Sequence, residues 1–393
     1  MATMSQLRAY QGHPLLSYGF RPFFLFGALY AALAVLAWLP MFHGELALAS
    51  AFSPLDWHVH EMLYGYLPAV ITGFLFTAIP NWTGRLPIKG GPLLALLLVW
   101  VAGRIAVTLS AGLGWTVAAL VDCAFLGLVA AMAAREIFAG KNWRNLKIVV
   151  LLTLLLAGNA AFHIEAQMQG HAWYGARIGI SVAIVLIMVI GGRIIPSFTI
   201  NWLKRNNPGR LAAPFSRFDL AVLALSVAAF AAWLLSPAGD VSATLLALAG
   251  LANIARLARW AGDRTLRDRL LLILHIGYAF VPLGFLLMAA ASLGMIVESA
   301  AIHAWTAGAI GVMTLAVMTR VSLGHTGRPL HASPTTQLIY AVILVAAVAR
   351  ICAALHPPLG TPLLHVAALA WAAAFLGFVV TFGPALMRER YKK

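Results

Sequence analysis

Long apolar stretches alternate with short polar segments along the whole chain. The stretches are roughly 18 to 22 residues long, which is about the length that a helix needs to cross a hydrocarbon core of roughly 30 Å. The pattern predicts an all-α fold, a polytopic membrane bundle of about twelve transmembrane helices. We expect these helices at roughly 20–40, 60–80, 91–110, 115–134, 146–166, 173–195, 215–236, 241–260, 270–292, 300–320, 335–355 and 362–384.

The composition agrees with a membrane protein, since 62% of the residues are hydrophobic and only 10% are charged. A soluble domain usually contains about 25% charged residues. The connections between the apolar stretches are short, so we expect no inserted soluble domain. The sequence therefore predicts a single integral membrane domain over residues 1–393.

The formal net charge of +15 reflects how lysine and arginine are distributed among the loops. Basic residues follow every second predicted helix, and the other loops contain mainly acidic residues, such as Glu45, Asp240 and Glu298. Basic loops of membrane proteins face the cytoplasm. The pattern predicts that both termini are cytoplasmic, and it removes the need to explain the charge by nucleic-acid binding.

Three arginines, Arg104, Arg177 and Arg350, lie inside predicted helices near their extracytoplasmic ends. An arginine in the bilayer costs on the order of 3 kcal/mol on insertion scales, so each needs a partner, a ligand carboxylate or water. The alternative is that the side chains extend to the outer headgroups.

An internal repeat relates the second and tenth predicted helices. His60 to Arg85 and His303 to Arg328 have the same spacing, and Gly65 matches Gly308. The helices that follow match around Arg104 and Arg350. The sixth helix, which begins after His171, is a weaker third copy. We therefore expect internal helical-hairpin repeats that bring corresponding residues to one depth.

Several histidines are predicted at the extracytoplasmic level. His60, Glu61 and Tyr64 can share one helix face, whereas His58 points elsewhere on a continuous helix. His163 and His303 lie at the same predicted depth. Neutral imidazole is a common ligand of haem iron and copper, and arginine suits haem propionates. The alternative is that these histidines only cap helices or line the interface.

A second polar layer is predicted at the cytoplasmic ends of helices, where Arg193, Arg320 and Asn81 lie, with His275 and His325 nearby. Helix ends and loop arginines explain most of this layer without a ligand. His275 lies within an apolar helix, so a second axial haem ligand is a further hypothesis.

Long motifs give the chain a family resemblance. They are His58-x-His-Glu-Met, Pro80-Asn-Trp-Thr-Gly-Arg, Gly191-Gly-Arg-Ile-Ile-Pro-x-Phe-Thr and Met318-Thr-Arg-x-Ser-Leu-Gly-His-Thr-Gly-Arg. With them the chain resembles the NnrS family over nearly its whole length. The resemblance implies a bacterial inner-membrane protein that contains haem b and copper and is linked to nitric oxide metabolism and nitrosative stress.

Our leading hypothesis is a protein that binds nitric oxide and reduces it to nitrous oxide, with electrons from an unidentified donor. Glu61 and Tyr64 are the candidate catalytic residues. The candidate metal ligands are His58, His60, His163 and His303, and the candidate cofactor-binding residues are His60, His303, His275, Arg104, Arg177 and Arg350. The alternative is a membrane transporter, or a haem-based sensor or scavenger of nitric oxide without turnover.

Overall fold

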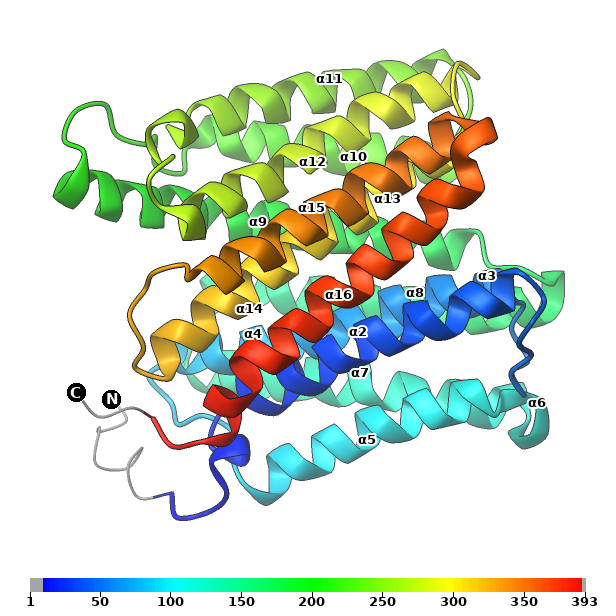
Figure 1. Ribbon diagram of the computed structural model, residues 1–393, viewed down its shortest axis with the longest axis horizontal. Coiled ribbons are helices and arrows are strands. Elements are labelled where there is room, and N and C mark those ends of the chain that lie inside the picture. The colour runs from blue at the N-terminus through cyan, green and yellow to red at the C-terminus, as the bar shows by residue number, and fades with distance from the viewer. Residues whose placement is uncertain (1–9, 391–393) are drawn as a thin grey trace. The chain divides into compact units, whose positions relative to one another are not determined.

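The computed structural model describes residues 10–390, and within that range it consists of helices and their connections (Figure 1). Twelve helices of the described residues are long and apolar enough to cross a membrane. They are α2 (Phe20–Phe42), α3–η2–α4 (Pro54–Thr83), α5 (Gly91–Thr108), α7 (Trp115–Ala139), α8 (Leu146–Gln169), α9 (Tyr174–Asn206), α10 (Arg217–Leu235), α11 (Asp240–Ala258), α12 (Arg269–Ser292), α13–η5–α14 (Glu298–His325), α15 (Pro334–Leu355) and α16 (Gly360–Met387). The predicted multi-pass, all-α membrane fold is confirmed.

Several helices extend beyond their predicted apolar cores. The second begins at Pro54, where the Ser53 hydroxyl accepts a hydrogen bond from the Asp56 amide at 3.1 Å. Serine at the N-cap followed by proline is a strong helix start. The sixth continues to Asn206, through polar residues that a hydropathy window leaves out. Both helices extend past the apolar layer, because the backbone hydrogen bonds of a helix do not depend on whether its side chains are polar.

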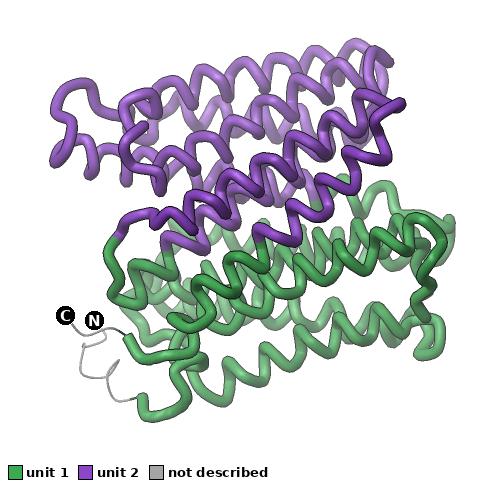
Figure 2. The backbone as a smooth tube through the Cα atoms, in the orientation of Figure 1, with its two compact units in different colours: residues 1–179, 321–329, 375–393 green, residues 180–320, 330–374 purple. Residues whose placement is uncertain are grey.

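The chain forms two compact units (Figure 2). Unit 1 contains residues 1–179, 321–329 and 375–393, and unit 2 contains residues 180–320 and 330–374. Unit 1 therefore combines the first five transmembrane helices with the beginning of α9 and the ends of α14 and α16. Unit 2 contains the helices between them in sequence.

Unit 1 is built around α7, which packs against α4, α5 and α8. Close approach of α5 and α7 depends on Gly103, because a Cβ there would lie 3.2 Å from the Asp122 Cα. That approach places Asp122 beside Arg104. The beginning of α2 is tied to the end of α16, since Arg21 Nη1 donates to the carbonyl oxygens of Leu386, at 2.8 Å, and Arg388, at 2.6 Å.

In unit 2, α12 packs against α11, α13 and η5, and α15 packs against α13 and η5. Its interior contains a buried ion pair, in which Arg256 Nε donates to Asp219 Oδ1 at 2.9 Å. Tyr278 and Asn253 extend this polar group by hydrogen bonds. Arg256 thus has an acidic partner of its own, Asp219, which is not a residue of the predicted site.

The second and tenth helices share an irregularity that supports the predicted repeat. Directly after His60 the helix widens into the π-helical segment η2 (Glu61–Tyr66), and directly after His303 the tenth helix widens into η5 (Ala304–Gly311). Such segments are rare and often lie at functional sites. The sixth helix is a regular α-helix from Tyr174 to Asn206, so the predicted third copy of the repeat lacks a π-helical segment.

Candidate metal centre

The centre of unit 1 is a group of buried polar side chains from four helices. His60 ends α3 and Glu61 begins η2, so the change of helix type lies between them. Both side chains are fully buried. His60 Nδ1 lies 2.9 Å from Glu61 Oε1, which is hydrogen-bonding distance.

Arg104 of α5 pairs with two carboxylates at once. Its Nη1 donates to both Glu61 carboxylate oxygens at 2.7 Å, and its Nη2 donates to Asp122 Oδ1 of α7. Tyr30 of α2 donates its hydroxyl to Glu61 Oε2. The guanidinium lies over Gly65, where any Cβ would collide with it. Glycine at that position is therefore required for this pairing.

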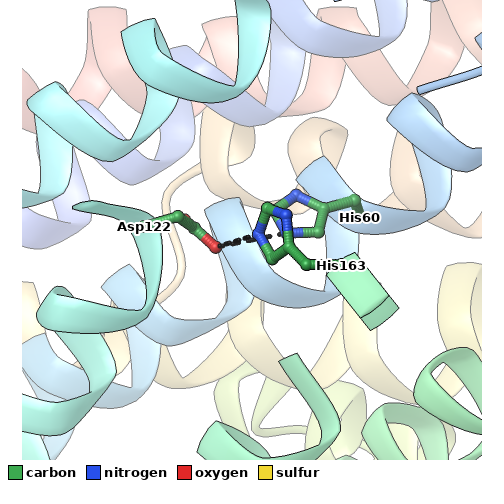
Figure 3. Close-up of side chains that lie close together, drawn as sticks. All are labelled: His60, Asp122 and His163. Carbon is green, nitrogen blue, oxygen red and sulfur yellow. Dashed lines mark hydrogen bonds and ion pairs between the residues drawn. The ribbon is translucent and has the colours of Figure 1, made fainter. Parts of the chain in front are cut away.

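The second oxygen of Asp122 faces two histidines (Figure 3). Asp122 Oδ2 lies 3.2 Å from His60 Nε2 and 3.1 Å from His163 Nε2 of α8. Asn159, one turn before His163, donates its amide to the same oxygen at 2.7 Å. Residues four apart on a helix share a face, which is why Asn159 and His163 reach the same carboxylate.

The ligand atoms of His60, Asp122 and His163 all lie within 4.8 Å of one another. Two ligands of one metal ion, each bound at about 2.1 Å, are separated by roughly 3 Å. The distances from Asp122 Oδ2 to the two imidazole nitrogens, 3.2 Å and 3.1 Å, match this spacing. The three side chains are all buried, and their ligand atoms converge without any bound ion.

The hydrogen-bonding pattern requires a proton or a metal ion between His60 Nε2 and the oxygens that face it. When His60 Nδ1–H donates to Glu61, the other ring nitrogen has a lone pair, yet it faces acceptor oxygens of Asn159, at 3.0 Å, and Asp122. Only a proton or a metal ion between them makes this arrangement favourable. The charge count agrees, because two carboxylates and one guanidinium leave one negative charge when both imidazoles are neutral. A histidine held by a carboxylate through its other nitrogen is the usual arrangement of metal-binding histidines. These residues therefore fit a metal ion.

The structure brings together only part of the predicted site. His60 and His163 converge as predicted ligands, whereas His58 stacks on the Trp38 ring, with centroids 4.2 Å apart. Tyr64 is buried beside His60, with its ring centroid 5.6 Å from that of the imidazole, and its hydroxyl donates to the Gly175 carbonyl at 2.6 Å. The catalytic roles of Glu61 and Tyr64 stay predictions.

The predicted arginines have different surroundings. Arg104 is engaged by Glu61 and Asp122, so in this arrangement its terminal nitrogens are not directed to a haem propionate. Arg177 lies over the Trp173 ring at 5.2 Å. The propionate role of both residues stays a prediction.

Three predicted residues belong to unit 2. His303 is half-buried, and its Nδ1 lies 2.7 Å from the Ser299 carbonyl oxygen. Arg350 donates to the Ser299 hydroxyl at 3.5 Å. His275 is buried, with Nε2 at 3.0 Å from the Thr199 hydroxyl and with no hydrogen-bond partner for Nδ1 among the described residues. Their roles as cofactor ligands also stay predictions.

Sequence reasoning missed Asp122, Asn159 and Tyr30. The signal for Asp122 was present, because it is a carboxylate in the middle of an apolar helix, where an ionisable residue is by default functional. Asn159 precedes His163 by one helical turn, so it could have been found from that histidine. Tyr30 carried no comparable signal.

The fold and this centre define a multi-pass membrane protein with a buried His–Asp–His cluster suited to a metal ion. The chain belongs to the NnrS family, because the family model described as NnrS protein matches residues 14–390. A search of curated proteins gave no match to the chain. Membership associates the chain with metal cofactors and with nitric oxide.

Proposed function

We propose that the protein binds nitric oxide at a metal centre held by His60, His163 and Asp122. The observation that carries the proposal is the convergence of these three buried ligand atoms within 4.8 Å. Family membership supplies the link to nitric oxide.

Copper is the metal that we assign to this cluster. Two imidazole nitrogens suit copper, and the site affinity of divalent first-row metals is highest for Cu²⁺. Haem b is the second proposed cofactor, on the strength of the family. Either His303 or His275 would hold it, since His303 lies near the extracytoplasmic end of its helix and His275 near the cytoplasmic end of α12. When bound, these metals would supply coordination of nitric oxide and transfer of single electrons.

The residues around the cluster position its ligands. Glu61 accepts hydrogen bonds from Arg104 and Tyr30, and these bonds stabilise its carboxylate. The carboxylate in turn fixes the ring of His60. This geometry suits orientation of the ligand better than delivery of a proton. Asn159 fixes the Asp122 carboxylate in the same way.

Reduction is the further step of the proposal. Two molecules of nitric oxide, two electrons and two protons give nitrous oxide and water, with the electrons coming from a donor in or at the bilayer. We place the protein in the bacterial inner membrane, where such donors are available to a multi-pass protein.

The first test is metal content and nitric oxide binding of the purified protein. We expect iron and copper by elemental analysis, and an optical spectrum of the reduced protein that changes when nitric oxide is added. His60→Ala and His163→Ala should lower copper content, and His13→Ala should not, since His13 is exposed and lies outside the cluster. Equal copper in all four proteins would refute the assignment.

The second test separates turnover from binding and transport. Protein in liposomes is given an electron donor and nitric oxide, and nitrous oxide is measured by gas chromatography. Nitrous oxide formation supports the reductase, and binding without it supports a sensor or scavenger. The internal repeat favours a transporter as the second candidate, and solute flux without turnover would identify it.

A further inference from the structure

Each unit contains a histidine followed by a π-helical segment, with an arginine in the next helix. The two sites differ in charge, because the arginine has carboxylate partners in unit 1 only. In unit 1 the π-helical segment after His60 begins with Glu61, and Arg104 of the following helix is neutralised by that residue and by Asp122. In unit 2 the π-helical segment after His303 begins with Ala304, and the arginine of the following helix is Arg350. The repeat has kept the arginine and lost the first carboxylate.

The second carboxylate is lost as well. Arg104 precedes Asp122 by 18 positions, and the same step from Arg350 reaches Ala368, with apolar residues on either side. Neither α15 nor α16 contains an acidic residue. A shift of one position in the alignment of the repeats therefore does not restore a counter-charge.

Among residues 10–390, no carboxylate forms an ion pair with Arg350. The residue lies in α15, which packs against α13 and η5, and it is half-buried. Its one hydrogen bond among the described residues runs from Nη2 to the Ser299 hydroxyl, at the long distance of 3.5 Å. The nearby acidic residue Glu298 instead accepts the indole N–H of Trp233 at 3.0 Å, and it forms no ion pair with Arg350.

A guanidinium inside an apolar helix has lost much of its hydration and retains most of its five donors. Its planar fork matches two oxygens of one anionic group, and such paired hydrogen bonds are stronger than neutral ones. Serine adds a hydroxyl that can donate to the same group. The polar atoms of the site thus suit an anion, whereas the cluster of unit 1 suits a cation.

We propose that Arg350 and Ser299 bind an anionic group that presents two oxygens to the guanidinium. The group is either a small dissolved oxyanion of the carboxylate type or the phosphate of a lipid headgroup. Both present two oxygens side by side to the guanidinium. The site lies outside the His60–Asp122–His163 cluster, although the Ser299 hydroxyl also lies 3.3 Å from Nδ1 of His303, a candidate haem ligand. Its test measures neither copper content nor nitric oxide binding, so its failure is distinguishable from failure of the function proposed above.

The test compares purified wild type, Arg350→Gln and the control Arg144→Gln. Arg144 is exposed and lies in the short 3-10 helix η3 (Trp143–Asn145) between α7 and α8, so its replacement removes the same charge elsewhere. In the first arm the unfolding midpoint is measured against sodium formate, with sodium chloride keeping the ionic strength constant. In the second arm native mass spectrometry counts bound phosphatidylglycerol after mild detergent extraction.

If the ligand is a small oxyanion, formate raises the midpoint of wild type and of Arg144→Gln to a plateau. The half-saturating concentration should then be at least about tenfold higher in Arg350→Gln. If the ligand is a lipid phosphate, formate has no saturable effect, and Arg350→Gln retains one phosphatidylglycerol fewer than the other two proteins.

Identical behaviour of all three proteins in both arms would overturn the proposal. Should Arg350→Gln fail to fold, Arg350→Lys decides in its place. Lysine keeps the charge but not the fork, so weaker formate binding or loss of the lipid supports the site, and wild-type behaviour in both arms refutes it.

Discussion

Replacing Asp122 by asparagine separates the stabilising role of this carboxylate from its role as a ligand. Asp122→Asn keeps the shape of the side chain but removes the charge that pairs with Arg104 and faces His60 and His163. Removing one partner of a buried ion pair costs about 3–5 kcal/mol. Arg104 retains both hydrogen bonds to Glu61, so we expect the lower end, about 3 kcal/mol.

The effect on the metal should exceed that of stability alone. Asp122 is the only anionic member of the three candidate ligands. Loss of an outer-shell partner already weakens metal binding about 10- to 100-fold, so loss of this ligand should weaken copper binding by about 100-fold or more. We would measure copper retained per protein during dialysis against graded chelator, together with the midpoint of thermal unfolding.

Unit 2 offers a matched control in Asp219→Asn. Asp219 forms a buried ion pair with Arg256, which also donates to the Met188 carbonyl at 3.1 Å. This variant should lose a similar amount of stability while keeping its copper. If both variants lose the same fraction of copper, the loss reflects general destabilisation, and if Asp122→Asn binds copper like wild type, the ligand assignment is wrong.

Further substitutions test the residues around the cluster. Glu61→Gln should weaken copper binding about 10- to 100-fold, because an amide fixes the His60 ring less well, and unchanged chelator resistance would contradict this role. Tyr30→Phe removes one hydrogen bond to the Glu61 carboxylate, so it should cost about 1.5–3 kcal/mol, seen as a lower unfolding midpoint with copper content preserved. Arg21→Gln should expose the end of α16 to limited proteolysis, because two hydrogen bonds to its carbonyls are lost; an unchanged cleavage rate would show that they do not secure this end.

The fold was largely predictable from the sequence, since a bilayer allows few alternatives to helices of fixed minimum length. The twelve predicted ranges correspond to twelve helices of the structure. The ends were less predictable. The start at Pro54 depends on the local cap formed by Ser53, and the continuation to Asn206 passes through residues that hydropathy assigns to a loop.

The candidate site was predictable only in part. Depth in the membrane was inferred from the sequence, and it grouped His60 with His163, whose ring centroids lie 4.8 Å apart in the structure. Depth does not specify which helices are neighbours, so it grouped those two with His58, whose ring instead stacks on Trp38. The partner of Arg104 was likewise hidden, because its pairing with Asp122 depends on close packing of α5 and α7.

The composition of unit 1 from three separate stretches of chain has a consequence for biosynthesis. Residues 321–329 and 375–393 complete this unit, although the first 179 residues leave the ribosome long before them. Insertion proceeds from the N-terminus, so the early helices must wait in the bilayer, without their last neighbours, while the intervening unit is made. Quality control acting on the nascent chain would therefore encounter an unfinished first unit until translation is nearly over, and a stop codon late in the message would damage the part of the protein that was made first.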